Sequence, residues 1–190
     1  AVKGISFSIG KGEIVGVVGE SGSGKSMSAL ALMGLLPKDA EIASGSLCFQ
    51  GEDLVTMKPE KRRQLCGSKM AMVFQEPMTS LNPLMPVGKQ IMEGMIWHYH
   101  TPKEEAYEKA LELMKLVGIT DAEKRIKNYP HQLSGGMRQR IVIAIALACD
   151  PELLICDEPT TALDVTIQSK ILELIQEIQK KRQLSVIYIT

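Results

Sequence analysis

At 190 residues the chain is long enough to bury a hydrophobic core, and its 45% hydrophobic and 23% charged residues are typical of a globular domain, which excludes a disordered chain. The 22 basic and 22 acidic side chains cancel, so net charge does not favour nucleic acid or an anionic membrane as the main partner. The longest apolar stretch is far shorter than the ~20 residues of a membrane-spanning helix, no signal peptide opens the chain, and we expect a soluble protein.

The predicted elements alternate between strands and helices. Short apolar runs predict strands at residues 5–9, 14–18, 47–49, 70–74, 153–156 and 185–189. Helical periodicity predicts helices at residues 25–36, 60–65, 87–97, 103–117, 136–149 and 165–181. The strands that begin at Ile14 and Leu153 are apolar throughout, as strands buried on both faces of a parallel sheet are. The sequence therefore predicts a layered α/β fold.

The middle of the chain has a different pattern. From residue 78 to about residue 117 there is no convincing strand, and Pro77, Pro83 and Pro86 interrupt the chain before helical periodicity resumes. We infer a mainly helical insert between two parts of an α/β core. The expected division is a core of residues 1–76 and 150–190 and a helical subdomain of residues 77–149.

Cysteine and histidine spacing does not indicate a metal site. The cysteines are widely spaced and include no C-x-x-C pair, so we expect reduced thiols in a cytosolic protein. They are Cys48, Cys66, Cys149 and Cys156. His98 and His100 are two residues apart, and on a helix they would point to different faces.

The first candidate site is a glycine-rich segment between the first buried strand and the helix that follows it. Its residues are Gly19, Glu20, Ser21, Gly22, Ser23, Gly24, Lys25 and Ser26, followed by Met27. Glycines allow a tight turn that directs successive amides at phosphate oxygens, at the mouth of a helix whose dipole favours anions. In such a P-loop, Lys25 would reach the β- and γ-phosphates and Ser26 would complete the Mg²⁺ shell. A glycine-rich turn without a ligand is the alternative, but the required order of strand, loop and helix favours binding of a nucleoside triphosphate.

Two carboxylates end the strand predicted at residues 153–156. Asp157 and Glu158 follow this apolar run directly. The carboxyl ends of parallel strands lie near the phosphates in a P-loop fold, where Asp157 can hold the Mg²⁺ shell and Glu158 can polarise the attacking water. An acidic turn that caps the next element is the alternative, and the neighbouring P-loop favours the catalytic interpretation.

A third segment precedes the helix predicted at residues 136–149. It comprises Leu133, Ser134, Gly135, Gly136 and Met137. Ser134 is a good N-cap and the glycines expose amides at a helix N-terminus, which makes a second anion site, although a capped helix with nothing bound has the same pattern. Arg138 and Arg140 lie near this N-terminus, where cations are unfavourable by ~0.3–1 kcal/mol, which favours an anionic contact there. The segment resembles LSGGQ, the signature motif of ATP-binding cassette (ABC) ATPases, with Met137 in place of Gln.

The resemblance continues in order across nearly the whole chain. Gln75 resembles the Q-loop glutamine, whose amide oxygen would join the Mg²⁺ and water network beside the catalytic Glu158. The D-loop, which touches the partner's site, is matched by Ala162, Leu163 and Asp164. In this family two cassettes pair head to tail, and the signature of one closes over the γ-phosphate held by the P-loop of the other. The resemblance implies a RecA-like P-loop NTPase fold with a mainly parallel sheet, an antiparallel β portion and a helical subdomain.

Within the family, QEPMTSLNP at residues 75–83 and YPHQ at residues 129–132 are similar to the ATPase subunits of dipeptide and oligopeptide importers, a branch that includes nickel importers. This likeness implies ATP-driven peptide import at the cytoplasmic face of the cell membrane. The implied partners are a second ATPase subunit, transmembrane permease subunits and, indirectly, a solute-binding protein, with no nucleic acid.

Two other functional classes were weighed against transport. A soluble ABC ATPase of translation or DNA repair is disfavoured because the chain has no tandem cassette, no coiled-coil insertion and no basic surplus. A kinase or GTPase is disfavoured because neither carries the signature motif. We expect the permease contact within residues 78–97, because the apolar side chains there exceed what a small insert needs for its own core.

The chain departs from the family pattern at both ends. The H-loop histidine would follow Thr190 directly, and the aromatic residue that stacks on adenine would precede Val2. We therefore expect an excised fragment, without the C-terminal extension of the peptide-importer branch. It would capture phosphate, sulfate or, weakly, a nucleotide at residues 22–26, and it would be largely monomeric and turn over little ATP.

Overall fold

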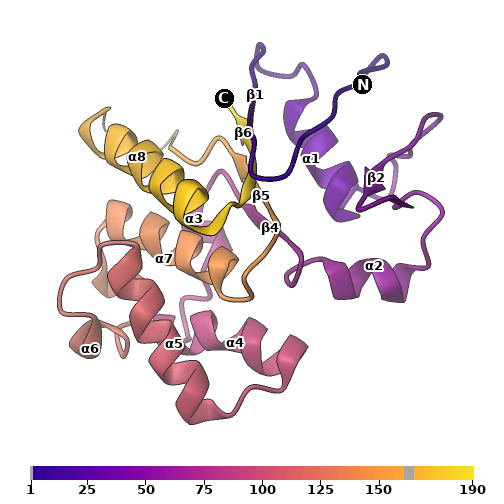
Figure 1. Cartoon of the computed structure of the whole chain (residues 1–190). Helices are drawn as coiled ribbons and strands as arrows, with labels where there is room; N and C mark the ends of the chain where they lie inside the picture. Colours follow the sequence, from indigo (N-terminus) through magenta and orange to yellow (C-terminus); the bar gives the residue numbers. More distant parts are fainter. Residues whose placement is uncertain (1, 161–164) are drawn as a thin grey trace.

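The computed structural model describes residues 2–160 and 165–190, without the side chains at 77, 78, 165 and 166 (Figure 1). Within this part of the chain, four parallel strands form the central sheet, in the order β1-β6-β5-β4. They are β1 (Ile14–Val17), β4 (Met70–Val73), β5 (Leu153–Asp157) and β6 (Ser185–Ile189). Every residue of β5 is buried, as its uninterrupted apolar sequence predicts, and so is every residue of β4. The same prediction is wrong for β1, whose residues are exposed or half-buried.

An antiparallel hairpin lies outside the main sheet. It pairs β2 (Cys48–Phe49) with β3 (Glu52–Asp53). The turn between them is Gln50–Gly51, and both residues have a positive φ, 52° and 81°, as a tight two-residue hairpin turn requires. The predicted antiparallel portion is therefore present, with a second strand that the sequence did not reveal.

The strand predicted at residues 5–9 is wrong. Residues 2–10 adopt no regular secondary structure. Their alternating apolar side chains have no described strand to pair with, and Ile5 and Phe7 are 56% and 50% exposed. Ile9 packs against the smaller of two hydrophobic cores.

All six predicted helices are present in the described residues. They are α1 (Lys25–Met33), α2 (Pro59–Leu65), α4 (Val87–Tyr99), α5 (Lys103–Leu116), α7 (Gly135–Leu147) and α8 (Val165–Arg182). The first ends three residues earlier than expected because Gly34 adopts a left-handed φ of 69° and closes the helix. The sequence did not reveal the short helices α3 (Pro77–Ser80) and α6 (Ala122–Arg125) or the 3₁₀ turn Pro130–Gln132.

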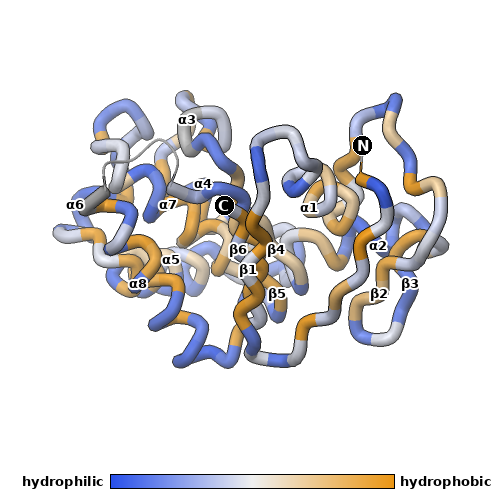
Figure 2. Tube along the Cα trace, turned by 90° about the horizontal axis from the view of Figure 1, so that it is seen from above, coloured by the Kyte–Doolittle hydropathy of each residue, from blue (hydrophilic) through white to orange (hydrophobic). Residues whose placement is uncertain are grey.

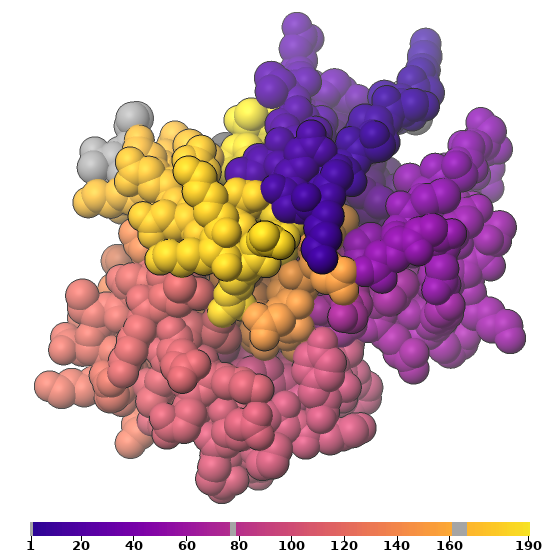
Figure 3. All heavy atoms as spheres, viewed as in Figure 1, coloured from indigo at the N-terminus to yellow at the C-terminus, as the bar shows by residue number. Residues whose placement is uncertain are grey.

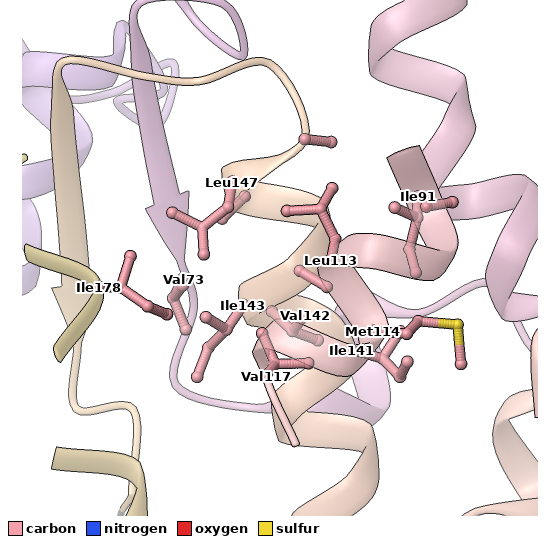
Figure 4. Close-up of a cluster of buried hydrophobic side chains, with 14 of the residues drawn as sticks. Val73, Ile91, Leu113, Met114, Val117, Ile141, Val142, Ile143, Leu147 and Ile178 are labelled. Carbon is pink, nitrogen blue, oxygen red and sulfur yellow. The ribbon is translucent and has the colours of Figure 1, made fainter. Parts of the chain in front are cut away.

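Two hydrophobic cores cover the two faces of the sheet. The larger core lies between one face and the helices α4, α5, α7 and α8, and it contains Val73, Ile143 and Ile178, which are neighbours in Figure 4. The smaller core packs Ala29 and Met33 of α1 against the other face. Figure 2 shows the strands as a hydrophobic centre, and Figure 3 shows the α4–α6 region at the bottom of the molecule and the β2–α2 region at its right.

The apolar side chains of residues 78–97 mostly belong to the larger core. Leu81, Ile91 and Met95 are 2% exposed or less. In the described part of this segment, the only exposed large apolar side chains are those of Leu84, which is 87% exposed, and Trp97, which is 74% exposed. The expectation of a broad apolar surplus is therefore wrong for most of the segment. None of the described helices combines the length and apolarity needed to cross a bilayer.

Candidate functional site

The glycine-rich loop connects β1 to α1 at the carboxyl end of the sheet. Gly22 and Gly24 have φ angles of 80° and 95°, which an L side chain rarely adopts. A side chain at Gly19 would lie 3.0 Å from the Ser23 hydroxyl. The loop turns through a hydrogen bond from the Ser23 amide to the Glu20 carbonyl (3.2 Å). The remaining loop residue, Ser21, is exposed, and Met27 is half-buried in the first turn of α1.

The first turn of α1 presents backbone amides that no side chain caps. Gly24 is the N-cap residue, and it makes no side-chain cap because it has no side chain. The uncapped amides lie at the positive end of the helix dipole, so the chain leaves an anion-binding position at this helix end.

Lys25 spans the inside of the loop. Its Nζ donates to the carbonyl oxygens of Gly19 (2.6 Å) and Glu20 (3.1 Å). The same ammonium lies 3.9 Å from Glu158 Oε1, and the Lys25 side chain is only 9% exposed. The cation is therefore held between the loop and the end of β5.

Ser26 and Asp157 form the second contact of the site. The Ser26 hydroxyl donates to Asp157 Oδ1 over 2.9 Å. Asp157 is 6% exposed, and burial is the main cause that raises its pKa, while the Ser26 hydrogen bond and Lys25 act in the opposite direction. Hydroxyl and carboxylate oxygens are ligands that Mg²⁺ prefers. A nearby cation would also stabilise the charged form of a carboxylate whose pKa is raised by burial. The two residues therefore fit a Mg²⁺ ion.

Glu158 and Gln75 meet at the ends of neighbouring strands. Gln75 Nε2 donates to Glu158 Oε2 over 2.8 Å, so the Glu158 carboxylate lies between an amide donor and the Lys25 ammonium. Glu158 has a φ of 44°, a left-handed conformation that costs a non-glycine residue about 1–2 kcal/mol. Its amide donates to the Ile189 carbonyl (3.0 Å), which holds this conformation in place. The strained backbone directs Glu158 toward the loop.

The structure thus brings together five residues that the sequence placed in three separate motifs. They are Lys25, Ser26, Gln75, Asp157 and Glu158. They end or follow β1, β4 and β5, whose parallel direction places all three carboxyl ends at one edge of the sheet.

The Leu133–Met137 segment occupies the start of α7, apart from this cluster. Leu133 is 4% exposed, and the Ser134 hydroxyl accepts the Met137 amide (3.3 Å), so Ser134 is the N-cap as predicted. Gly135 is the first residue of α7. A side chain at Gly136 would lie 3.2 Å from Ile167, so this glycine also lets α7 and α8 pack closely. Within the described residues, no hydrogen bond or ion pair joins the segment to the glycine-rich loop.

The charge argument made for Arg140 is wrong. Its Nη1 donates to the carbonyl oxygen of Val117, at the C-terminal end of α5. A cation at a helix C-terminus is favourable, so Arg140 has a structural partner and does not indicate an anion at the start of α7. The predicted D-loop, Ala162, Leu163 and Asp164, lies outside the described residues.

Two contacts, one with the loop and one with the far end of α1, were not found from the sequence. A side chain at Gly24 would overlap the Val2 side chain, so the N-terminal segment lies against the loop. Arg62 of α2 contacts the far end of α1. No sequence signal distinguishes Arg62 from Arg63, because both are basic residues in the last turn of an exposed helix.

Comparisons with known proteins agree on one family. The family model described as "ABC transporter" matches residues 2–161. The chain is 56% identical over 190 residues to the dipeptide transport ATP-binding protein DppD of Haemophilus influenzae, covering all of the chain and 58% of that protein. It is 52% identical over 191 residues to the oligopeptide transport ATP-binding protein OppD of Bacillus subtilis, covering all of the chain and 53% of that protein. The chain thus spans little more than half the length of these relatives.

Solved structures show the same fold. A dimeric ATP-binding cassette in a post-hydrolysis state, bound to ADP and Pi, matches with a TM-score of 0.86 and 28% identity, covering all of this chain and 79% of that one. The cbiO1 protein of Clostridium perfringens, described as part of the ABC transporter complex cbiONQ, matches with a TM-score of 0.83 and 30% identity, covering all of this chain and 71% of that one. The P-loop NTPase fold expected from the sequence is confirmed.

Proposed function

The chain belongs to the ABC transporter family, and we propose that it is the ATP-binding and ATP-hydrolysing cassette of a subunit that powers import of dipeptides or oligopeptides. The names of its relatives support the peptide substrate, since DppD and OppD match it along its whole length at 56% and 52% identity. The observation that carries the proposal is the convergence of Lys25, Ser26, Gln75, Asp157 and Glu158 at one edge of the sheet.

Each residue of this cluster then has a chemical role. The uncapped amides of α1 bind the phosphates, and Lys25 exchanges the Gly19 and Glu20 carbonyls for the β- and γ-phosphate oxygens. Ser26 and Asp157 would hold Mg²⁺, which when bound would neutralise charge on the phosphates. Glu158 accepts a proton from the attacking water, and its distance to Lys25 lengthens once Lys25 turns to the phosphates.

Gln75 is proposed to control access to the Glu158 carboxylate. In the structure its amide nitrogen donates to Glu158, which leaves its amide oxygen as the remaining acceptor for Mg²⁺ or water. A rotation of this one side chain would withdraw the amide donor from the carboxylate. Gln75 is exposed, so such a rotation meets no packed core.

We also propose a head-to-tail pair of cassettes. The start of α7 offers a second anion-binding helix end, yet no hydrogen bond or ion pair among the described residues joins it to the loop that would hold the nucleotide. In a pair of cassettes, the Ser134 segment of one cassette would close over the γ-phosphate that the glycine-rich loop of the other cassette holds. The dimeric state of the cassette solved with ADP and Pi supports the arrangement. The partner can be an identical chain or a paralogue.

Permease subunits at the cytoplasmic face of the membrane are the proposed third component, with a solute-binding protein acting through them. Leu84 supports this, because a leucine that is 87% exposed beside the start of α4 is suited to a protein contact. A chain with equal numbers of acidic and basic side chains supports no nucleic-acid partner. The division into a core of residues 1–76 and 150–190 and a helical subdomain of residues 77–149 is part of the same proposal.

Substitution of Lys25 tests the nucleotide site. Lys25→Ala removes a charge-assisted partner of the phosphates worth ~1.5–3 kcal/mol, so we expect ATP to bind roughly 10- to 150-fold more weakly in the presence of Mg²⁺. Isothermal titration calorimetry measures the dissociation constant directly. Lys11→Ala is the matched control, because Lys11 is exposed and lies before β1. Unchanged affinity in Lys25→Ala, with the protein folded, would refute the assignment.

A further inference from the structure

The C-terminal end of α1 is held by side chains from the segment that contains α2. Arg62 Nη2 donates to the carbonyl oxygen of Ala31 and, over 3.1 Å, to that of Leu32. The Cys66 thiol donates to the Met33 carbonyl (3.2 Å). The amides of Gly34 and Leu35 serve the carbonyls of Ala31 and Leu30, and the last two carbonyls of the helix, those of Leu32 and Met33, accept hydrogen bonds from side chains 30 or more positions away in the chain.

Helix α1 has few other anchors. Among its nine residues only Ala29 and Met33 are buried. Its own sequence supplies no basic residue in the last turn, so the Arg62 guanidinium is the cation that faces the negative end of its dipole. The helix is thus fixed in the smaller core by Ala29 and Met33, with the half-buried Leu30 and Leu32 packed against that core, and at its end by Arg62.

The position of Arg62 is closely defined. A side chain at Gly34 would lie 2.9 Å from Arg62 Nε and 3.2 Å from its Cζ, so the guanidinium packs directly against the backbone that ends α1. Nε is buried without a hydrogen-bond partner, so the other end of the guanidinium makes the polar contacts. No residue of α2 is fully buried, which makes Arg62 a principal tie between this exposed helix and α1. Figure 1 shows α1 running toward α2.

We propose that Arg62 is a positioning residue for the phosphate site. The proposal rests on the function proposed above. A nine-residue helix is a rigid rod about 14 Å long, so a shift at its last turn moves its first turn too. The first turn carries Lys25 and Ser26, and Ser26 must stay within hydrogen-bond distance of Asp157 on β5. Arg62 therefore sets the depth and tilt at which α1 presents these two side chains, although it touches neither the phosphates nor the metal.

Binding of two ligands to four purified proteins tests the proposal. Wild type, Arg62→Ala, Arg62→Lys and Arg63→Ala are titrated with Mg²⁺-ATP and with inorganic triphosphate, which reports the phosphate site without the base. Arg63→Ala is the matched control, because it removes the same charge from the same helix at an exposed position. Circular dichroism gives each Tm, and the titrations are run at a temperature where all four proteins are folded.

We expect Arg62→Ala to bind both ligands roughly tenfold more weakly, because small displacements of positioned groups have large effects. Arg62→Lys keeps the charge but not the planar fork, so it should lie between Arg62→Ala and wild type. Arg63→Ala should match wild type. The proposal is overturned if Arg62→Ala has a lower Tm but binds both ligands as tightly as wild type. If Arg62→Ala does not fold, the proposal is overturned when Arg62→Lys binds both ligands with wild-type affinity. A wild-type chain that binds neither ligand refutes the proposed function itself, before Arg62 is changed.

Discussion

The substitution Gly88→Ala adds one methyl group and tests how closely α4 packs against Ile126. Gly88 lies in the first turn of α4, and its amide donates to the carbonyl oxygen of Ile126 over 3.0 Å. A Cβ at this position would lie 2.7 Å from that oxygen and closer still to the Ile126 side chain. The oxygen belongs to the backbone, so it cannot rotate away as a side chain can.

Two opposing effects determine the stability of Gly88→Ala. Helix propensity alone favours alanine over glycine by up to ~1 kcal/mol. Overpacking against the backbone of Ile126 costs ~1–3 kcal/mol, and the shift that relieves it weakens the Gly88 hydrogen bond, worth about 1 kcal/mol. We therefore expect a net loss of about 1–3 kcal/mol in the free energy of unfolding.

Urea denaturation followed by circular dichroism measures this loss, with Gly94→Ala as the control on the same helix. A Cβ at Gly94 would lie 3.1 Å from Cys149 Sγ, the movable end of a side chain, so we expect a change within about 0.5 kcal/mol of wild type or a gain. A Gly88→Ala protein as stable as wild type, with an unchanged m-value, would refute the close packing of α4 against Ile126.

Three further outcomes are expected. Glu158→Gln should keep its affinity for Mg²⁺-ATP, but phosphate release by the assembled transporter should be roughly 10²–10⁴-fold slower, because an amide cannot accept the proton from water. Turnover at the wild-type rate would place the catalytic role elsewhere. Leu84→Asp should abolish transport without changing ATP affinity, and normal peptide uptake would exclude Leu84 from the permease contact. In the native chain at pH 7.5, a thiol reagent should label exposed Cys48 but not Cys149 or Cys156, where burial raises the pKa of the thiol to about 11 and about 12. Mass spectrometry before and after unfolding in urea identifies the labelled cysteines, and rapid labelling of Cys156 in the native chain would contradict its burial.

Sequence patterns predicted the elements whose stability depends on local signals. An uninterrupted apolar run at residues 153–156 identifies a buried strand, and the carboxylates that come directly after the run lie near the loop because parallel strands end at the same edge. The glycines of the loop were recognisable in the sequence because a tight turn favours glycine. The backbone at Gly22 and Gly24 has a positive φ, which an L side chain rarely adopts.

The errors arose where structure depends on distant parts of the chain. Ile5 and Phe7 alternate as they would in a strand, but alternation does not reveal whether a partner edge exists. Glu52–Asp53 forms a strand although acidic residues have low β-propensity, because the Gln50–Gly51 turn aligns it with Cys48–Phe49. The partners of Arg140 and Arg62 lie 23 and 30 or more positions away, beyond any local pattern.

The order of the strands has a consequence for how the protein is made. Strand β6 follows the other described strands along the chain, yet it lies between β1 and β5, which carry the two halves of the site. Ser26 and Asp157, 131 positions apart, cannot settle into register until residues 185–189 have left the ribosome and entered the sheet. A nascent chain can thus display the whole glycine-rich loop and both carboxylates without a finished site. A nucleotide that binds this site would therefore stabilise only chains in which β6 has entered the sheet.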